Sequence, residues 1–92
     1  MSAENRFANI TTNTTTQVKG GNGVLKAIVL NKPVASSTIT IYDNTGSDTS
    51  VPIGIITNTT DVKPYEMLYD LKFSTGLKIV TSGADNLTVV YR

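Results

Sequence analysis

The sequence has no cysteine, no histidine and no tryptophan among its 92 residues. Without cysteine, neither a disulfide nor a thiolate metal cluster can stabilise a small fold. Without histidine, the chain lacks the side chain that most readily exchanges protons near pH 7, which excludes Ser-His-Asp, Cys-His and common zinc arrangements. Seven acidic residues, most of them in segments that look like turns, are a poor basis for a paired-carboxylate hydrolase. We therefore expect a protein that is not an enzyme, with no cofactor and no metal.

Charge of either sign is also scarce. The sequence carries 8 Lys+Arg against 7 Asp+Glu, and the lysines are spread singly along the chain. Nucleic-acid binding needs clustered cations, so no nucleic-acid partner is expected. The longest apolar run, Ala27 to Leu30, is far short of the roughly 20 residues of a membrane-spanning helix. The first ten residues lack the hydrophobic stretch of a secretory signal, which indicates a protein made and used without export.

Threonine and asparagine are abundant, and they favour strands and turns respectively. Short apolar segments alternate with turn residues every 8–12 positions, and 92 residues suffice for one domain. The expected strands are Val24–Asn31, Thr38–Tyr42, Val51–Thr57, Tyr65–Phe73, Leu77–Thr81 and Leu87–Arg92. This pattern predicts an all-β fold: a small antiparallel β-sandwich or jelly-roll-like domain of about six to eight strands.

Alternation within these segments predicts which side chains face the core. Ile39 and Ile41 are expected to point inward. In the following segment, Val51, Ile53 and Ile55 share one face, which leaves Ile56 outside together with Leu68 and Val90. Segment 65–73 is expected to contribute most to the core, through Tyr65, Met67, Tyr69, Leu71 and Phe73. Segments 77–81 and 87–92 are expected to form a terminal hairpin.

The first third of the chain has little apolar periodicity. Residues 1–22 are interpreted as an N-terminal arm followed by a polar edge strand or linker, and residues 23–92 as the β-sandwich domain. Phe7 and Ile10 are the large apolar side chains of the arm, so they are the candidate anchors to a neighbouring subunit or a larger surface; the alternative is that the arm folds back onto its own domain. On this interpretation, deleting residues 1–9 should leave the sandwich folded and weaken assembly.

The loop from Asp43 to Ser50 provides the remaining candidate contacts. Its oxygen-bearing side chains surround a glycine, as in some calcium loops, but it lacks the distal glutamate and is better interpreted as turn chemistry. Tyr42, Asp43 and Asn44 are predicted to contact a partner from this end of the molecule. Outward tyrosines could alternatively stack on a sugar ring.

The region from Ala27 to Arg92 resembles the small accessory structural proteins of tailed bacteriophages, of the head-decoration and head-fibre type. The resembling stretches are ITIYDNTGS, VPIGIIT and the ending YEMLYDLKFSTGLKIVTSGADNLTVVYR. The resemblance implies a compact β-sandwich that binds major capsid or other virion proteins without catalysis, as a trimer or other homo-oligomer on the virion. A receptor- or carbohydrate-binding module of a phage fibre or tail is the alternative, and an anti-host or regulatory protein is a third class.

Overall fold

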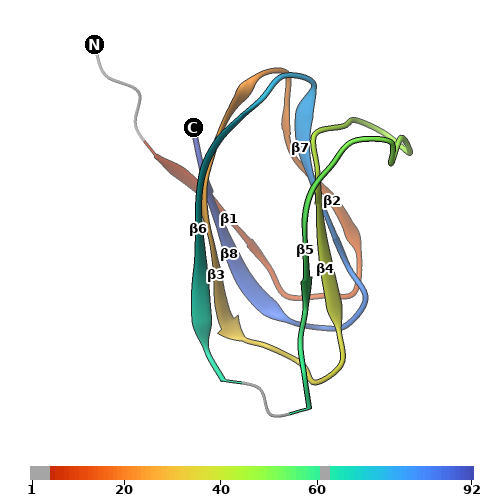
Figure 1. The fold of residues 1–92 in the computed structure, drawn as a ribbon, viewed down its shortest axis with the longest axis vertical. Coiled ribbons are helices and arrows are strands. Elements are labelled where there is room, and N and C mark those ends of the chain that lie inside the picture. Colours follow the sequence, from red (N-terminus) through yellow and green to blue (C-terminus); the bar gives the residue numbers. More distant parts are fainter. Residues whose placement is uncertain (1–4, 61–62) are drawn as a thin grey trace.

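The computed structural model describes residues 5–60 and 63–92, and within them it contains eight β-strands and no helix (Figure 1). The strands are β1 Arg6–Ile10, β2 Thr15–Gly20, β3 Gly23–Lys32, β4 Thr38–Tyr42, β5 Pro52–Thr57, β6 Tyr65–Phe73, β7 Gly76–Thr81 and β8 Asn86–Tyr91. The predicted all-β class is confirmed. A membrane-spanning helix is likewise absent from the described residues.

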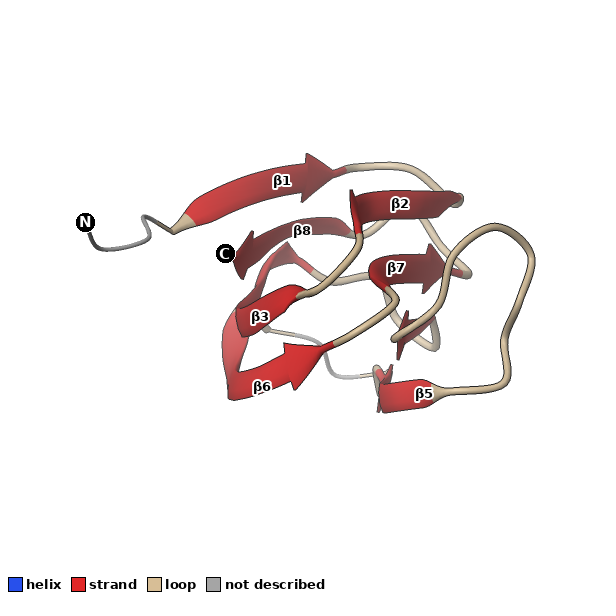
Figure 2. Cartoon of the chain, turned by 90° about the horizontal axis from the view of Figure 1, so that it is seen from above, coloured by secondary structure: helices blue, strands red, loops and turns tan. Residues whose placement is uncertain are grey.

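The strands form two four-stranded antiparallel sheets packed face to face. Sheet A has the order β1-β8-β3-β6, and sheet B has the order β2-β7-β4-β5. Viewed from above, β1 and β2 lie along one side of the sandwich, and β6 and β5 lie along the opposite side (Figure 2). This strand order is that of an eight-stranded jelly roll.

The core lies between the two sheets, where the alternating apolar positions meet. Ile39 and Ile41 of β4 are fully buried, while the threonines between them point away from the core, as the alternation predicts. β3 is a central strand of sheet A, with β8 and β6 beside it; its Leu25, Ile28 and Leu30 are fully buried in the core, whereas Val24 and Val29 are partly exposed. The largest buried side chain is Phe73, at the end of β6.

The sandwich begins before residue 23. Residues 6–10 form β1, which pairs with β8, and residues 15–20 form β2, which pairs with β7. The polar first third therefore supplies two edge strands, where one face or one edge is solvated and an apolar pattern is not required. The part of the predicted arm from residue 1 to residue 4 lies outside the described residues.

The predicted terminal hairpin is wrong. β7 lies in sheet B between β2 and β4, whereas β8 lies in sheet A between β1 and β3. Residues 82–85 carry the chain from one sheet to the other, and the fully buried Asp85 fixes that passage. Among the described strands, only β4 and β5 are consecutive in sequence and paired with each other.

β6 contributes less to the core than its pattern predicts. The predicted face is correct, because Met67 and Leu71 pair with the inward Ile28 and Leu25. However, Met67 is 41% exposed and Leu71 is 44% exposed. The reason is position: β6 is an edge strand of sheet A, so part of its inner face lies at the margin of the core and stays open to solvent.

In β5 the predicted inward face is also wrong at two positions. Ile56 is buried and pairs with Ile39, whereas Ile55 is 64% exposed. Strand β5 carries one residue more than β4 between the pairs Ile41–Gly54 and Tyr42–Pro52. This bulge reverses the alternation that the sequence suggests.

One end of the sandwich is held by a buried polar network. The carboxylate of Asp85 accepts hydrogen bonds from the backbone N–H of Val34 at 2.6 Å, the hydroxyl of Ser37 at 2.7 Å and the amide of Asn58 at 3.1 Å. The Tyr65 hydroxyl donates to Asn58 Oδ1 at 2.8 Å. The network joins connections between the two sheets, and each buried side-chain nitrogen or oxygen atom of the described residues has a hydrogen-bond partner.

Candidate interaction surface

An apolar row crosses the outer face of sheet A, which points away from the core. In register, Phe7 of β1 lies opposite Val90 of β8, Val90 lies opposite Ala27 of β3, and Ala27 lies opposite Leu68 of β6. Directly opposite residues point to the same side of a sheet, so the four side chains form one row about 14 Å long, three strand spacings of about 4.8 Å. Phe7 is 73% exposed and Leu68 is 76% exposed. We call these four residues the apolar row.

The two predicted arm anchors separate in the structure. Ile10 is 4% exposed, pairs with Leu87 and belongs to the chain's own core. Phe7 is displayed on the surface at one end of the apolar row. Leu68 and Val90 fall on the outer face as expected. Their alignment with Phe7 depends on strand order and register, which no local sequence pattern carries.

A ladder of amides and hydroxyls borders the apolar row on one side. The Asn9 amide donates to Asn86 Oδ1 at 2.9 Å and to Thr88 Oγ1 at 3.4 Å. From the other side, the Asn31 amide donates to the same two oxygens, at 3.2 Å and 3.0 Å. These side chains hold one another flat across β1, β8 and β3, so this part of the outer face is rigid and uncharged.

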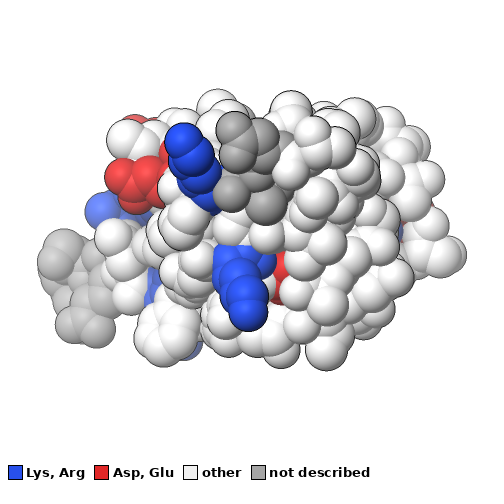
Figure 3. Space-filling model, turned by 90° about the horizontal axis from the view of Figure 1, so that it is seen from below, with Lys and Arg blue, Asp and Glu red and all other residues white. Residues whose placement is uncertain are grey.

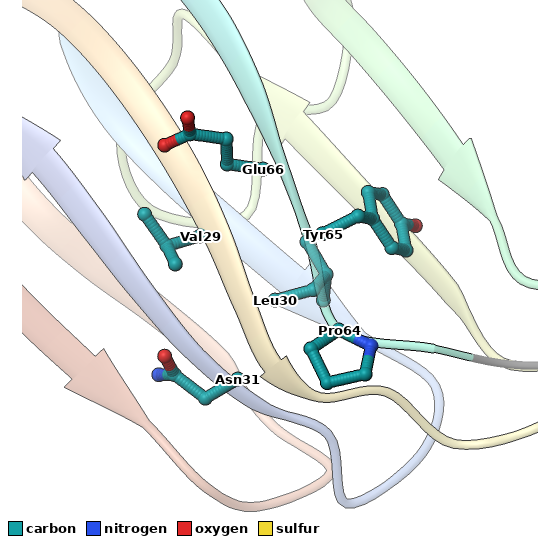
Figure 4. A pocket seen from close by; sticks show the side chains of 6 residues that line it. All are labelled: Val29, Leu30, Asn31, Pro64, Tyr65 and Glu66. Carbon is teal, nitrogen blue, oxygen red and sulfur yellow. The ribbon is translucent and has the colours of Figure 1, made fainter.

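A shallow pocket of about 380 Å³ lies at the β3–β6 end of this ladder. Figure 4 shows Val29, Asn31 and Glu66 pointing to one side of β3 and β6, while the Tyr65 ring points to the other side, toward the core. The outward wall therefore combines an aliphatic, an amide and a carboxylate group. This wall extends the same outer face.

An ion pair borders the row on its other side. Lys26 Nζ lies 2.7 Å from Asp70 Oδ1, and this hydrogen bond and charge lower the pKa of Asp70 below its usual 3.8. Asp70 has a φ of 79°, in the left-handed region. It lies where β6 has one residue more than β3, between the pairs Leu25–Leu71 and Ala27–Leu68. The pair neutralises both charges beside the row.

The loop between β4 and β5 is held by side chains that were predicted to contact a partner, and that contact stays a prediction. The Asp43 carboxylate accepts backbone hydrogen bonds from Thr75 at 2.8 Å and from Ser74 at 3.0 Å, and Asn44 is buried, where its Oδ1 accepts from Val51 N. Desolvation raises the pKa of Asp43, but the hydrogen bonds from residues 74–76 outweigh it and lower the pKa overall. The Asp43 side chain thus holds the loop to the turn before β7, the Asn44 side chain joins the two ends of the loop, and Tyr42 is partly exposed beside it.

Lys78 supplies an internal cation to this loop, and sequence reasoning missed it. Its side chain, on the outer face of sheet B, is 2% exposed. The ammonium donates to the carbonyl of Gly46 at 3.0 Å and to the carbonyl of Asp48, and it lies 5.1 Å from the centroid of the Tyr42 ring. Two backbone carbonyl oxygens of this loop therefore bind an ammonium group. The only local signal was a lysine inside an apolar strand.

On the end of the molecule that Figure 3 shows, a few basic and acidic side chains stand among uncharged residues, without a patch of one sign. Within residues 5–60 and 63–92, no group of three or more Asp or Glu side chains is arranged to hold a metal ion.

Comparison with known proteins finds similarity of fold. No protein-family model and no curated protein matches the sequence. A solved structure that matches over almost its full length is the Drosophila NLP core, described in connection with pentamer formation and histone binding. The TM-score is 0.58 at 13% sequence identity, covering 98% of this chain and 97% of that chain. At this sequence identity, the structural similarity shows a shared fold alone.

Proposed function

We propose that this chain is a non-catalytic structural protein of a bacteriophage virion, of the capsid-decoration or head-fibre type, which acts by binding neighbouring protein surfaces. The observation that carries the proposal is the apolar row of Phe7, Val90, Ala27 and Leu68 on the outer face of sheet A. The row ends in the exposed Phe7 and Leu68, with Val90 partly exposed and Ala27 buried between them. Exposed apolar side chains of this kind are typical of protein contacts. The resemblance of residues 27–92 to phage accessory proteins supplies the virion context.

The mechanism would be cementing. A rigid sandwich that spans two capsid subunits adds buried area to both, and a ligand that binds only the assembled state stabilises that state by mass action. The apolar row is small compared with the roughly 800 Å² per partner of a standard interface. Each contact would therefore be weak alone, and repeated contacts on a symmetric particle would provide avidity.

Mass spectrometry of purified virions tests this proposal. The chain should be present in stoichiometric amounts, and its removal should lower the melting temperature of the particle. In a binding assay with empty capsids, Leu68→Asp should weaken association because it places a charge in the apolar row. Absence of the chain from purified particles would contradict the proposal.

A second candidate function, a receptor- or carbohydrate-binding module, is favoured by one specific observation. A groove of about 430 Å³ lies beside the loop between β4 and β5, lined by an aromatic ring, hydroxyl groups and aliphatic carbons. The lining residues are Thr15, Tyr42, Gly46, Ser47, Thr49, Lys78 and Val80. Binding of the isolated domain to a glycan array, abolished by Tyr42→Ala, would favour this function over the first.

The histone binding described for the NLP core has weaker support in this chain. Histones are strongly basic because they hold DNA phosphates, so their partners benefit from negative charge. This sequence has a net charge of +1. The oligomeric assembly described for that protein is the more relevant parallel, since a closed homo-oligomer is expected here too.

A further inference from the structure

The four edge strands of the sandwich are not equivalent. Three of them carry an extra residue relative to the neighbour with which they pair: β2 between Gln17 and Lys19, β5 between Pro52 and Gly54, and β6 between Leu68 and Leu71. Bulges at an edge twist its free backbone groups away and oppose pairing with another chain.

β1 lacks this protection. Its five residues pair with β8 without a register shift, from Arg6 opposite Tyr91 to Ile10 opposite Leu87. It contains neither proline nor glycine, and its one charged residue is Arg6. In the described part of the chain, β8 is its single strand neighbour. A regular, nearly uncharged edge is a template for one further strand.

From this asymmetry we infer that β1 is the docking edge for a second copy of the chain, with β1 of each copy antiparallel and Phe7 opposite Phe7 of the other copy. The inference rests on the proposed role as a protein that acts by contact, and it names one partner and one surface. Pairing would join the two four-stranded A sheets into one sheet of eight strands around a two-fold axis.

The register follows from the side chains of β1. Residues directly opposite in an antiparallel pair share a face, so a two-fold axis can be centred on any one residue. Centring on Arg6 places two like charges opposite each other, which is unfavourable. Centring on Asn9 pairs residues 8–10 with each other and leaves the exposed Phe7 opposite Thr11, which lies outside the strand.

Centring on Ala8 pairs all five residues of β1 with β1 of the other copy, whereas centring on Phe7 pairs residues 6–8 with each other and brings residue 9 opposite residue 5. The exposed side chain of Phe7 favours the second register. With Phe7 at the centre, two exposed rings meet as a cross-strand aromatic pair, which stabilises a sheet relative to a pair of alanines. The apolar row then continues without interruption from Leu68 of one copy to Leu68 of the other. With Ala8 at the centre, the Phe7 ring of each copy lies opposite Asn9 of the other copy.

Cysteine substitution tests the register directly, because the native chain has no cysteine. Directly opposite residues have Cα atoms about 4.5–5.5 Å apart, within disulfide range. Phe7→Cys should therefore form covalent dimers on mild oxidation. Asn9→Cys, on the same face and strand, should stay monomeric, since its two copies would be about 14 Å apart. If covalent dimers form only when Phe7→Cys and Asn9→Cys are mixed, residue 7 of one copy lies opposite residue 9 of the other. That result would overturn the Phe7-centred register.

Sedimentation velocity over a range of concentrations tests the dimer without oxidation. The native chain should show a rising dimer fraction, and Phe7→Asp should abolish it. Leu68→Asp is the matched control: an equally exposed member of the same row, on the opposite edge, which should retain the dimer. A chain that stays monomeric throughout, or equal loss in both variants, would overturn the inference. A monomeric chain that still binds capsids would overturn the inference and leave the proposed function standing.

Discussion

Lys78 shows how one residue can hold a loop that the backbone alone leaves undetermined. Its ammonium satisfies the carbonyls of Gly46 and Asp48 from the neighbouring strand. Replacing it with methionine would keep most of the volume and leave both acceptors without their partner. We expect Lys78→Met to lower the free energy of unfolding by about 1–3 kcal/mol. Urea denaturation measures the loss, with the exposed Lys72→Met as the control; equal stability of both variants would show that the loop does not need the cation.

Asp43 is expected to make the stability of the fold depend on pH in the acidic range. Hydrogen bonds from residues 74–76 keep its pKa in the folded chain below the usual 3.8. Such a group stabilises the fold above its unfolded pKa, and that contribution is lost as the pH falls through the folded pKa. The melting temperature of the native chain should therefore fall more steeply below about pH 4 than that of Asp43→Asn. Parallel curves for the two proteins would contradict this assignment, since Asp48 and Asp70 contribute equally to both.

Gly23 marks a close approach between elements. A Cβ atom there would collide with the backbone carbonyl of Arg92 and lie 2.6 Å from the Phe73 ring. Backbone cannot yield as a flexible side chain can, so Gly23→Ala should separate the ends of β3 and β8. We expect a loss of about 1–3 kcal/mol in thermal unfolding. Gly20→Ala meets nothing within 4 Å and should be tolerated; a similar loss in both variants would exclude steric crowding as the cause.

The side chains that face the core could be predicted from the sequence for central, regular strands. They could not be predicted where an edge position or a bulge changes which side chains are buried. Alternation placed Ile39 and Ile41 correctly because β4 is central. It failed at Ile55 and Ile56, since a bulge is set by the partner strand. It also overestimated β6, because an edge strand can carry an inward apolar face that nothing covers.

The candidate interaction surface was predictable only in part, for a related reason. Phe7, Leu68 and Val90 could be recognised as surplus apolar residues. They lie in one row because β1 pairs with β8, β8 with β3 and β3 with β6, and these segments are far apart in the sequence. The roles of Asp43 and Asn44 inside the fold could not be seen either, because the same residue types suit a free loop and a hydrogen-bonded one.

At the scale of the whole molecule, the first strand completes one sheet and is not an appendage. Deleting residues 1–10 would remove the buried Ile10 and expose the edge of β8. Loss of one buried isoleucine side chain costs about 2–5 kcal/mol, so the shortened chain should melt at a lower temperature and aggregate. Deleting residues 1–4 keeps every described β1 pair and should leave the melting temperature unchanged. Full stability without residues 1–10 would restore the interpretation of this region as a separate arm.

The pairing of the first strand with the last has a consequence for biogenesis. In the described part of the chain, β1 has no strand neighbour to join until β8 has emerged from the ribosome, since β1 pairs with β8 from Arg6 opposite Tyr91 to Ile10 opposite Leu87. Non-local topologies of this kind fold slowly, in milliseconds to seconds. Throughout synthesis the nascent chain must therefore carry an open edge and unshielded isoleucines, and the protein depends on completing translation before those surfaces meet another chain.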